Sequence, residues 1–93
     1  MRLLNEFATG TYEGTGAAVS VSCGFSPLCV IVWNEEDGDE LFIHIDGMTD
    51  AHAIKIAAAV SALTSQGITL SSTGFSVGTG PSESGKTHRY LAF

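Results

Sequence analysis

Positive charge is scarce in this 93-residue chain, which has four Lys and Arg residues against ten Asp and Glu residues and a formal net charge of −6. Attraction to nucleic-acid phosphates requires clustered cations, and four scattered ones do not form a cluster. Long apolar runs are also missing. The longest apolar region, Ala51 to Leu63, is interrupted by His52, Lys55 and Ser61, whereas a membrane span needs about 18 apolar residues. We therefore expect neither nucleic acid nor a membrane as a partner.

Cysteine and proline occur only twice each. Two cysteines, Cys23 and Cys29, are too few for a disulfide-stapled miniprotein and are typical of a reducing compartment, where cysteine acts as a small buried apolar residue. A bond between them is geometrically possible across the intervening turn, but a reducing compartment argues against it. Arg2 is followed by only Leu3 and Leu4, whereas a signal peptide has an apolar core of about 7–15 residues. We expect the chain to be made and kept in a cytoplasm.

The residues that are present indicate one small β-rich domain. A chain of 93 residues exceeds the roughly 50 needed for a hydrophobic core and is far below the ~250 beyond which chains divide. Hydrophobic residues make up 44% of the chain, and 11 glycines with many Ser and Thr residues are typical of short strands joined by turns. We expect a mainly β (α+β) fold, a small antiparallel β-sandwich or barrel-like domain at residues 17–93. An N-terminal arm or edge strand is expected at residues 1–16.

Periodicity places the strands. Apolar and polar residues alternate from Ala17 to Cys23, which predicts a half-buried strand. Leu28 to Trp33 is a continuous, β-branched apolar run, typical of a strand covered on both faces, and we expect it to be the central strand. Further strands are predicted at residues 41–45, 68–70, 75–77 and 87–93.

One short helix is predicted near residues 50–64. Thr49 or Asp50 is suited to cap it, the segment is rich in Ala, and Gly67 follows where a helix C-terminus favours glycine. The apolar residues at helical spacing are Ile54, Ala57, Ala58 and Ala62. The same reasoning from residue type places aromatic side chains and cysteines in the core and histidines at the surface. The aromatic core candidates are Phe25, Phe75 and Phe93.

Residues Gly80 to Thr87 match the phosphate-binding pattern G-x-x-x-x-G-K-[ST] at every position. That motif requires a helix that starts at the lysine and faces the phosphate. The following segment, His88 to Phe93, is too short and too aromatic for such a helix. We interpret the match as a turn that joins two strands.

No other pattern indicates catalysis or metal binding, and we expect no enzyme activity and no cofactor. The acidic run Glu35 to Glu40 does not have the ligand spacing of a calcium loop and is interpreted as a solvated hairpin tip. The chain contains no G-x-S-x-G, and a triad built on Ser26 or Cys29 has no support in spacing. The potential metal ligands lack C-x₂-C or H-x₃-H spacing; they are Cys23, Cys29, His44, Asp46, His52 and His88.

The order of short motifs is more informative than any one of them. The chain contains Phe7-x-x-Gly10-x-Tyr12-x-Gly14-x-Gly16, Gly24-Phe25-Ser26-Pro27-x-x-Val30-Ile31-Val32, Gly74-Phe75-Ser76-Val77-Gly78 and Ser84-Gly85-x-Thr87-x-x-Tyr90-x-Ala92-Phe93. This order resembles a small β-rich structural module of tailed-bacteriophage virion proteins, of the capsid decoration (cement) or tail-fibre type. Glu83 stands where the family often has Asn.

The resemblance implies a virion structural protein made in the host cytoplasm. Its expected role is to decorate the outer surface of the head, bound to the major capsid protein or other virion proteins as a homotrimer. We expect contacts to a neighbour from Leu3, Leu4, Phe7 and Tyr12. Two alternatives remain: a tail fibre, tip or adaptor subunit, and a small ligand-binding β-domain that stacks its ligand on Trp33, Tyr12 and Tyr90.

Overall fold

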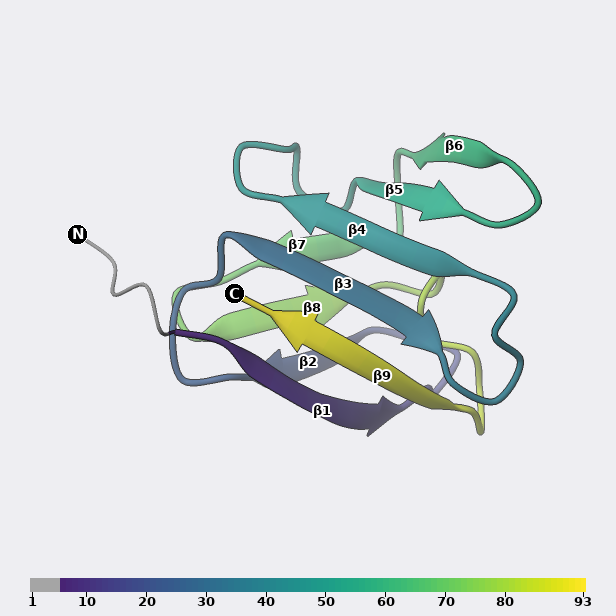
Figure 1. Ribbon diagram of the computed structural model, residues 1–93, viewed down its shortest axis with the longest axis horizontal. Helices are drawn as coiled ribbons and strands as arrows, with labels where there is room; N and C mark the ends of the chain where they lie inside the picture. Colours follow the sequence, from purple (N-terminus) through teal and green to yellow (C-terminus); the bar gives the residue numbers. More distant parts are fainter. Residues whose placement is uncertain (1–5) are drawn as a thin grey trace.

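The computed structural model describes residues 6–93, and every regular element in that range is a β-strand. Nine short strands follow one another along the chain (Figure 1). They are β1 (Ala8–Glu13), β2 (Val19–Ser22), β3 (Cys29–Asn34), β4 (Leu41–Ile45), β5 (Ala53–Ile56), β6 (Val60–Leu63), β7 (Ile68–Leu70), β8 (Gly74–Val77) and β9 (Thr87–Ala92).

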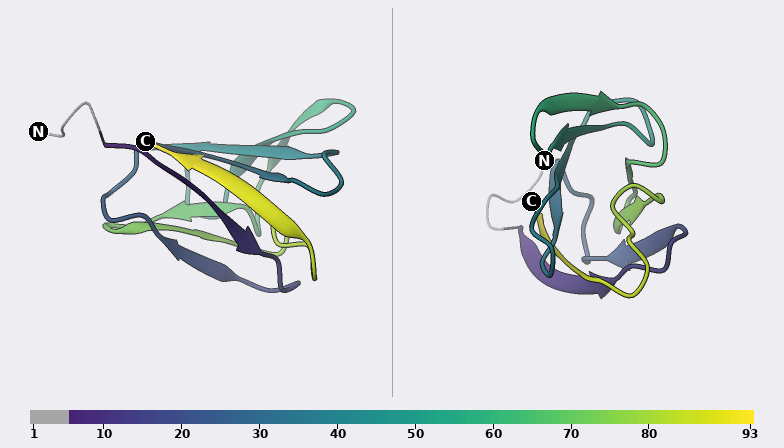
Figure 2. Two further views of the ribbon diagram at one scale, coloured as in Figure 1. Left: turned by 60° about the horizontal axis from the view of Figure 1, so that its bottom comes forward. Right: turned by 90° about the vertical axis from the view of Figure 1, so that its right-hand side faces the viewer.

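The strands form two antiparallel sheets that face each other (Figure 2). The larger sheet has six strands in the order β1-β9-β3-β4-β5-β6, and the smaller has three in the order β2-β8-β7. The prediction of a mainly β, antiparallel domain is confirmed, and of the two expected forms, sandwich or barrel, the structure has two facing sheets. Because β1 pairs with β9 along its whole length, residues 8–13 form an edge strand of the main sheet.

The core lies between the two sheets and follows from the alternation of side chains along each strand. Val30 and Val32 of β3 point inward from the large sheet, and Ile68, Phe75 and Val77 point inward from the small one; each is at most 1% exposed. The Phe75 ring also meets the Tyr90 ring edge-on, with centroids 5.2 Å apart. One face of each sheet is thereby buried within the monomer.

The helix predicted near residues 50–64 is wrong. Residues 53–56 form β5, residues 57–59 turn, and residues 60–63 form β6. Alanine favours helix by only a few tenths of a kcal/mol per residue over most other residues. Here β5 pairs with β4 and buries Ala53 to 2% exposure, so sheet pairing and burial override the local preference.

Four further predictions of burial are corrected. Phe93 is 42% exposed, whereas His44 and His88 are each only 2% exposed. Cys23 and Cys29 are free thiols that are half-buried. The continuous apolar run in β3 is central in the large sheet, as expected, but within the monomer only its inner face is covered.

Among residues 6–93 there is no helix long and apolar enough to cross a membrane.

Candidate functional site

The phosphate-binding pattern lies in the loop between β8 and β9, and Thr87 begins a strand. A phosphate loop presents free backbone N–H groups to its ligand. Here the N–H of Gly80 donates to Gln66 O, and the N–H of Gly85 donates to Gly14 O. The N–H groups of residues 82, 83, 86 and 87 also have protein acceptors. The loop therefore lacks the helix that binds a phosphate, and six of its seven backbone N–H groups already donate to the protein itself.

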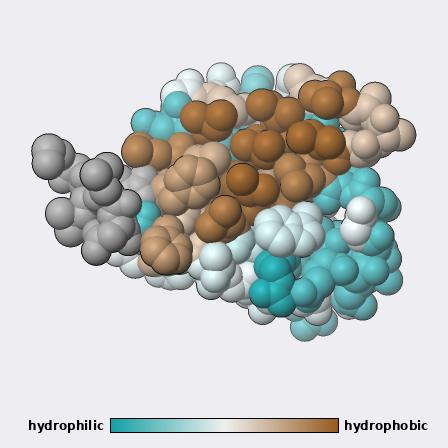
Figure 3. Space-filling view, in the orientation of Figure 1, coloured by the Kyte–Doolittle hydropathy of each residue, from teal (hydrophilic) through white to brown (hydrophobic). Residues whose placement is uncertain are grey.

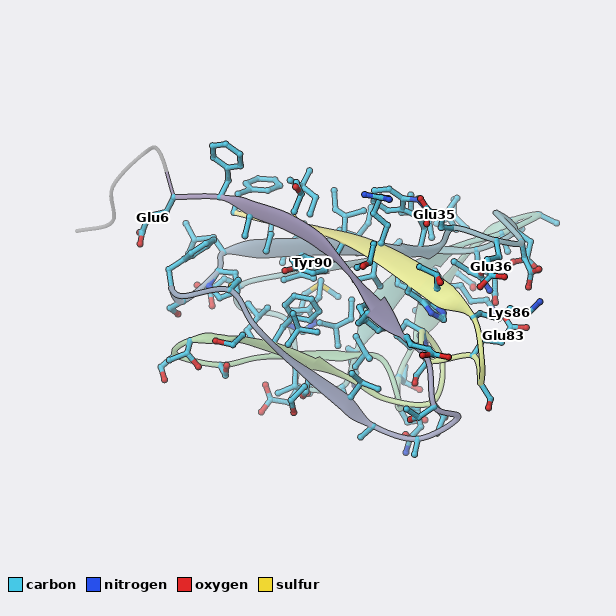
Figure 4. The ribbon with its side chains drawn as sticks, turned by 90° about the horizontal axis from the view of Figure 1, so that it is seen from below. Glu6, Glu35, Glu36, Glu83, Lys86 and Tyr90 are labelled. Carbon is cyan, nitrogen blue, oxygen red and sulfur yellow. The ribbon has the colours of Figure 1, made fainter. Side chains whose placement is uncertain are left out.

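The polar side chains near this loop are also hydrogen-bonded within the protein, and Asn34 is at the centre of these bonds. Figure 4 shows Glu35, Glu36, Glu83 and Lys86 gathered at one end of the molecule. Asn34, which is 3% exposed, donates its amide to Glu83 Oε2 at 2.6 Å and to Asp37 Oδ2 at 3.1 Å. Its Oδ1 accepts the N–H groups of residues 36 and 37. Asn34 thus holds the β3–β4 turn against the β8–β9 loop.

The buried histidines and Tyr12 stabilise loops in the same way. The Tyr12 ring stacks on His88 with centroids 5.1 Å apart, and its hydroxyl donates to Pro81 O at 2.7 Å. Burial raises the pKa of the Tyr12 hydroxyl well above its usual range. His88 Nδ1 lies 3.0 Å from Lys86 O, and His44 Nδ1 lies 2.7 Å from His52 O. Among the described residues, no group of three or more His, Cys, Asp or Glu side chains is arranged to hold a metal ion.

The contact residues expected from the sequence separate in the structure. Leu3 and Leu4 lie outside the described residues, and Phe7 is 66% exposed. Tyr12 is buried and is removed from the candidate contacts. Tyr90 lies between the sheets as well (Figure 4). The three aromatics proposed to stack a ligand therefore do not share one exposed platform.

The structure instead shows an apolar surface on the outer side of the six-stranded sheet (Figure 3). The strand register places its side chains together, because directly paired residues point to the same face. Ile31 pairs with Ile43 and with Leu91, and Ile43 pairs with Ile54. We call this surface the apolar face; by register it comprises Phe7, Cys29, Ile31, Trp33, Leu41, Ile43, Ile45, Ile54, Ile56, Val60, Leu91 and Phe93.

The opposite outer surface, on the small sheet, has a different chemistry. Ser20 and Ser76 are directly paired there, and Thr69 pairs with Ser76. These hydroxyls, with those of Ser22, Ser71 and Thr73, line a depression of about 370 Å³ together with Val21, Leu70 and Phe75. We call this outer surface of the small sheet the hydroxyl face. An antiparallel sheet with one solvated side normally alternates apolar-in and polar-out, and only the small sheet follows that rule.

A hollow of about 400 Å³ lies at one end of the apolar face. Trp33, Leu41 and Ile56 supply its apolar side, and Asp39 and Glu40 line its acidic side. Lys55 Nζ pairs with Glu40 Oε2 at 2.8 Å, and the hydrogen bond that the Lys55 amine donates to Glu40 raises the pKa of that amine. The hollow has the size and mixed character to accept a protruding side chain of a partner.

Comparison with known proteins gives no match among family models, curated proteins or solved structures. The apolar face was missed as a site by sequence reasoning, although a signal for it was present. The run from Cys29 to Trp33 has the composition of a strand covered on both faces, and the monomer covers only one of them.

Proposed function

We propose that this chain is a structural protein that binds another protein surface through its apolar face. Within that class, we propose a decoration (cement) protein on the outer surface of a tailed-bacteriophage head. The observation that carries the proposal is the open apolar face, where Ile45 is 48% and Val60 70% exposed. Large contiguous apolar surfaces are rare on monomers and mark interaction sites.

The size of the face supports its use as the centre of a protein–protein interface. Six strands at ~4.8 Å spacing and about 17 Å of strand length give a footprint of roughly 400 Å². A standard interface covers about 800 Å² on each partner. The face is thus half of a standard interface, and contacts at its rim, including Phe7 and the hollow beside Trp33, would complete it.

The two outer faces also support an oriented attachment. With the apolar face on the head, the hydroxyl face points to solvent, and a net charge of −6 keeps the free protein soluble. The mechanism is mass action: a protein that binds only the assembled lattice stabilises it by RT ln(1 + [L]/Kd) at each site. No chemical step is required.

The copy number in the virion tests this proposal. Quantitative mass spectrometry of gradient-purified heads and tails would count this chain relative to the major capsid protein. A count close to that of the capsid protein in heads is the expected result. A few copies confined to tails would instead identify a fibre, tip or adaptor subunit, and absence from both would refute a virion role.

A further inference from the structure

A second feature, which adjoins the apolar face and shares Ile56 and Val60 with it, is the open edge formed by β6. This strand ends the large sheet, and within residues 6–93 no other strand pairs with its outer side (Figure 1). The seven consecutive residues Ile56–Ala62 are all exposed, and six of them are apolar. An exposed edge presents unpaired N–H and C=O groups at every second residue and invites pairing with another strand.

Natural edge strands are normally protected by charges, proline, bulges or a covering segment. The strand β6 has neither a charged residue nor a proline. No charged residue and no proline occurs between Lys55 and Pro81. Two of the other three described edges differ. The edge of β7 is covered through Ala51, whose N–H donates to Ile68 O. The edge strand β1 ends in the exposed Glu13.

We propose that β6 pairs antiparallel with β6 of a second copy of this chain about a two-fold axis, which joins two six-stranded sheets into one. With Ser61 at the axis, Ser61 lies opposite Ser61 and Val60 lies opposite Ala62 of the second copy. The Val60 and Ala62 side chains share the outer face in both copies, so the pairing is apolar on apolar. The register is self-complementary, as a two-fold contact requires.

Charge favours a second copy over a different partner. A strand that carried cations or acids would find no counter-charge on this edge, because the seven exposed residues are uncharged. The second copy brings an equally neutral edge. The pairing also extends the apolar face without a break from one copy to the next. The inference does not rest on the proposed function, since it concerns the free protein in solution.

The contact is small, which sets the expected strength. A pair of strands of about seven residues covers much less than the ~1,200 Å² of a standard interface, so the dimer belongs to the weak, transient class. We therefore expect a monomer–dimer equilibrium in the high-micromolar range. Sedimentation velocity of the full chain from micromolar to millimolar concentration measures it.

Ser61→Glu is the variant that separates dimer from fold. In the monomer, Ser61 pairs with Lys55 across β5 and β6, so a glutamate there meets a cation and the fold is retained. In the dimer it places two carboxylates directly opposite each other, which is unfavourable. We expect the dissociation constant to rise about tenfold or more. Ser61→Gln, of equal size and without charge, is the matched control and should dimerise like the parent.

Two further measurements identify the contact. Mixing Ser61→Glu with Ser61→Lys should restore association, because the opposed charges then attract. Ser61→Cys, in a chain whose Cys23 and Cys29 are replaced by serine, should form a disulfide-linked dimer on mild oxidation. Opposed residues in an antiparallel pair have Cα atoms about 4.5–5.5 Å apart, within the range of a disulfide. Ser20→Cys on the hydroxyl face should not cross-link.

The inference is overturned by several results. One is a monomer at every concentration together with no Ser61→Cys cross-link. Equal association of the parent and the Ser61→Glu variant would place the contact elsewhere. A trimer or an open-ended fibre would also refute it, because a two-fold contact closes after two copies. Each of these results leaves the count of copies in the virion, and hence the proposed function, untouched.

Discussion

Replacement of Ile31 and Ile43 together by threonine is expected to abolish most of the binding by the apolar face while the fold survives. The two residues are directly paired at the centre of β3 and β4, and both are half-buried in the monomer. Threonine is β-branched, so the preference for strand is retained.

The size of the effect follows from burial. Complete burial of an isoleucine contributes about 1.5–3 kcal/mol, so a half-buried one gains about 1 kcal/mol when a partner covers it. A threonine hydroxyl buried without a partner adds about 1 kcal/mol or more of cost. For two residues the loss is about 3–4 kcal/mol, which corresponds to a rise in the dissociation constant of ~10²–10³-fold.

Co-sedimentation of the purified protein with heads that lack it measures that dissociation constant. The matched control replaces Ser20 and Ser76, a directly paired couple on the hydroxyl face, with threonine and should bind like the parent. Circular dichroism and a thermal melt verify that both variants fold. The reasoning is refuted if the Ile31→Thr/Ile43→Thr protein binds with an unchanged dissociation constant, or if the control loses as much affinity.

Three other predictions concern single side chains. Burial raises the pKa of Tyr12 above its ordinary value of 10.0, so the stability it contributes is complete below pH 10 and is lost as the pH rises further. Urea unfolding at increasing alkaline pH should show this decline, and a flatter decline in Tyr12→Phe would confirm its source. Asn34→Asp removes both donated hydrogen bonds and sets a third carboxylate beside Glu83. The unfolding free energy should fall by about 2–4 kcal/mol. An unchanged denaturation midpoint would show that Asn34 does not hold the β3–β4 turn against the β8–β9 loop. Burial also raises the pKa of the Cys29 thiol, so its alkylation at neutral pH should be slower than that of a small free thiol and slower still on heads. Mass spectrometry measures the rate of Cys29 alkylation. Equal alkylation rates for the free and the head-bound protein would show that the apolar face stays open on heads.

The strands that could be predicted are those whose local pattern agrees with their final environment. Val19 and Val21 alternate with serines, and β2 has that alternation in the structure. The turn interpretation of the Gly80–Thr87 segment is confirmed, because it depended on chemistry that follows the motif rather than on the motif itself.

The segment at residues 50–64 was not predictable in the same way. Its alanines favour helix, and its apolar residues also satisfy helical spacing. Only the position of β4 next to β5, where Ile43 pairs with Ile54, shows that the segment extends the sheet. Local preference amounts to tenths of a kcal/mol per residue, whereas the burial of a single large side chain contributes more than 1 kcal/mol.

The sequence by itself determined that the chain forms a small β-rich domain, because composition and period-two alternation act residue by residue along the strand. It also excluded a working phosphate loop. Only the tertiary structure decided which apolar residues are core and which form the apolar face. The composition of a strand indicates that a side chain favours burial. Whether another part of the chain covers that side chain depends on how distant strands pair. For Val30 the small sheet does so; Ile31, one residue further on, points to the outer side of the large sheet, away from the small sheet.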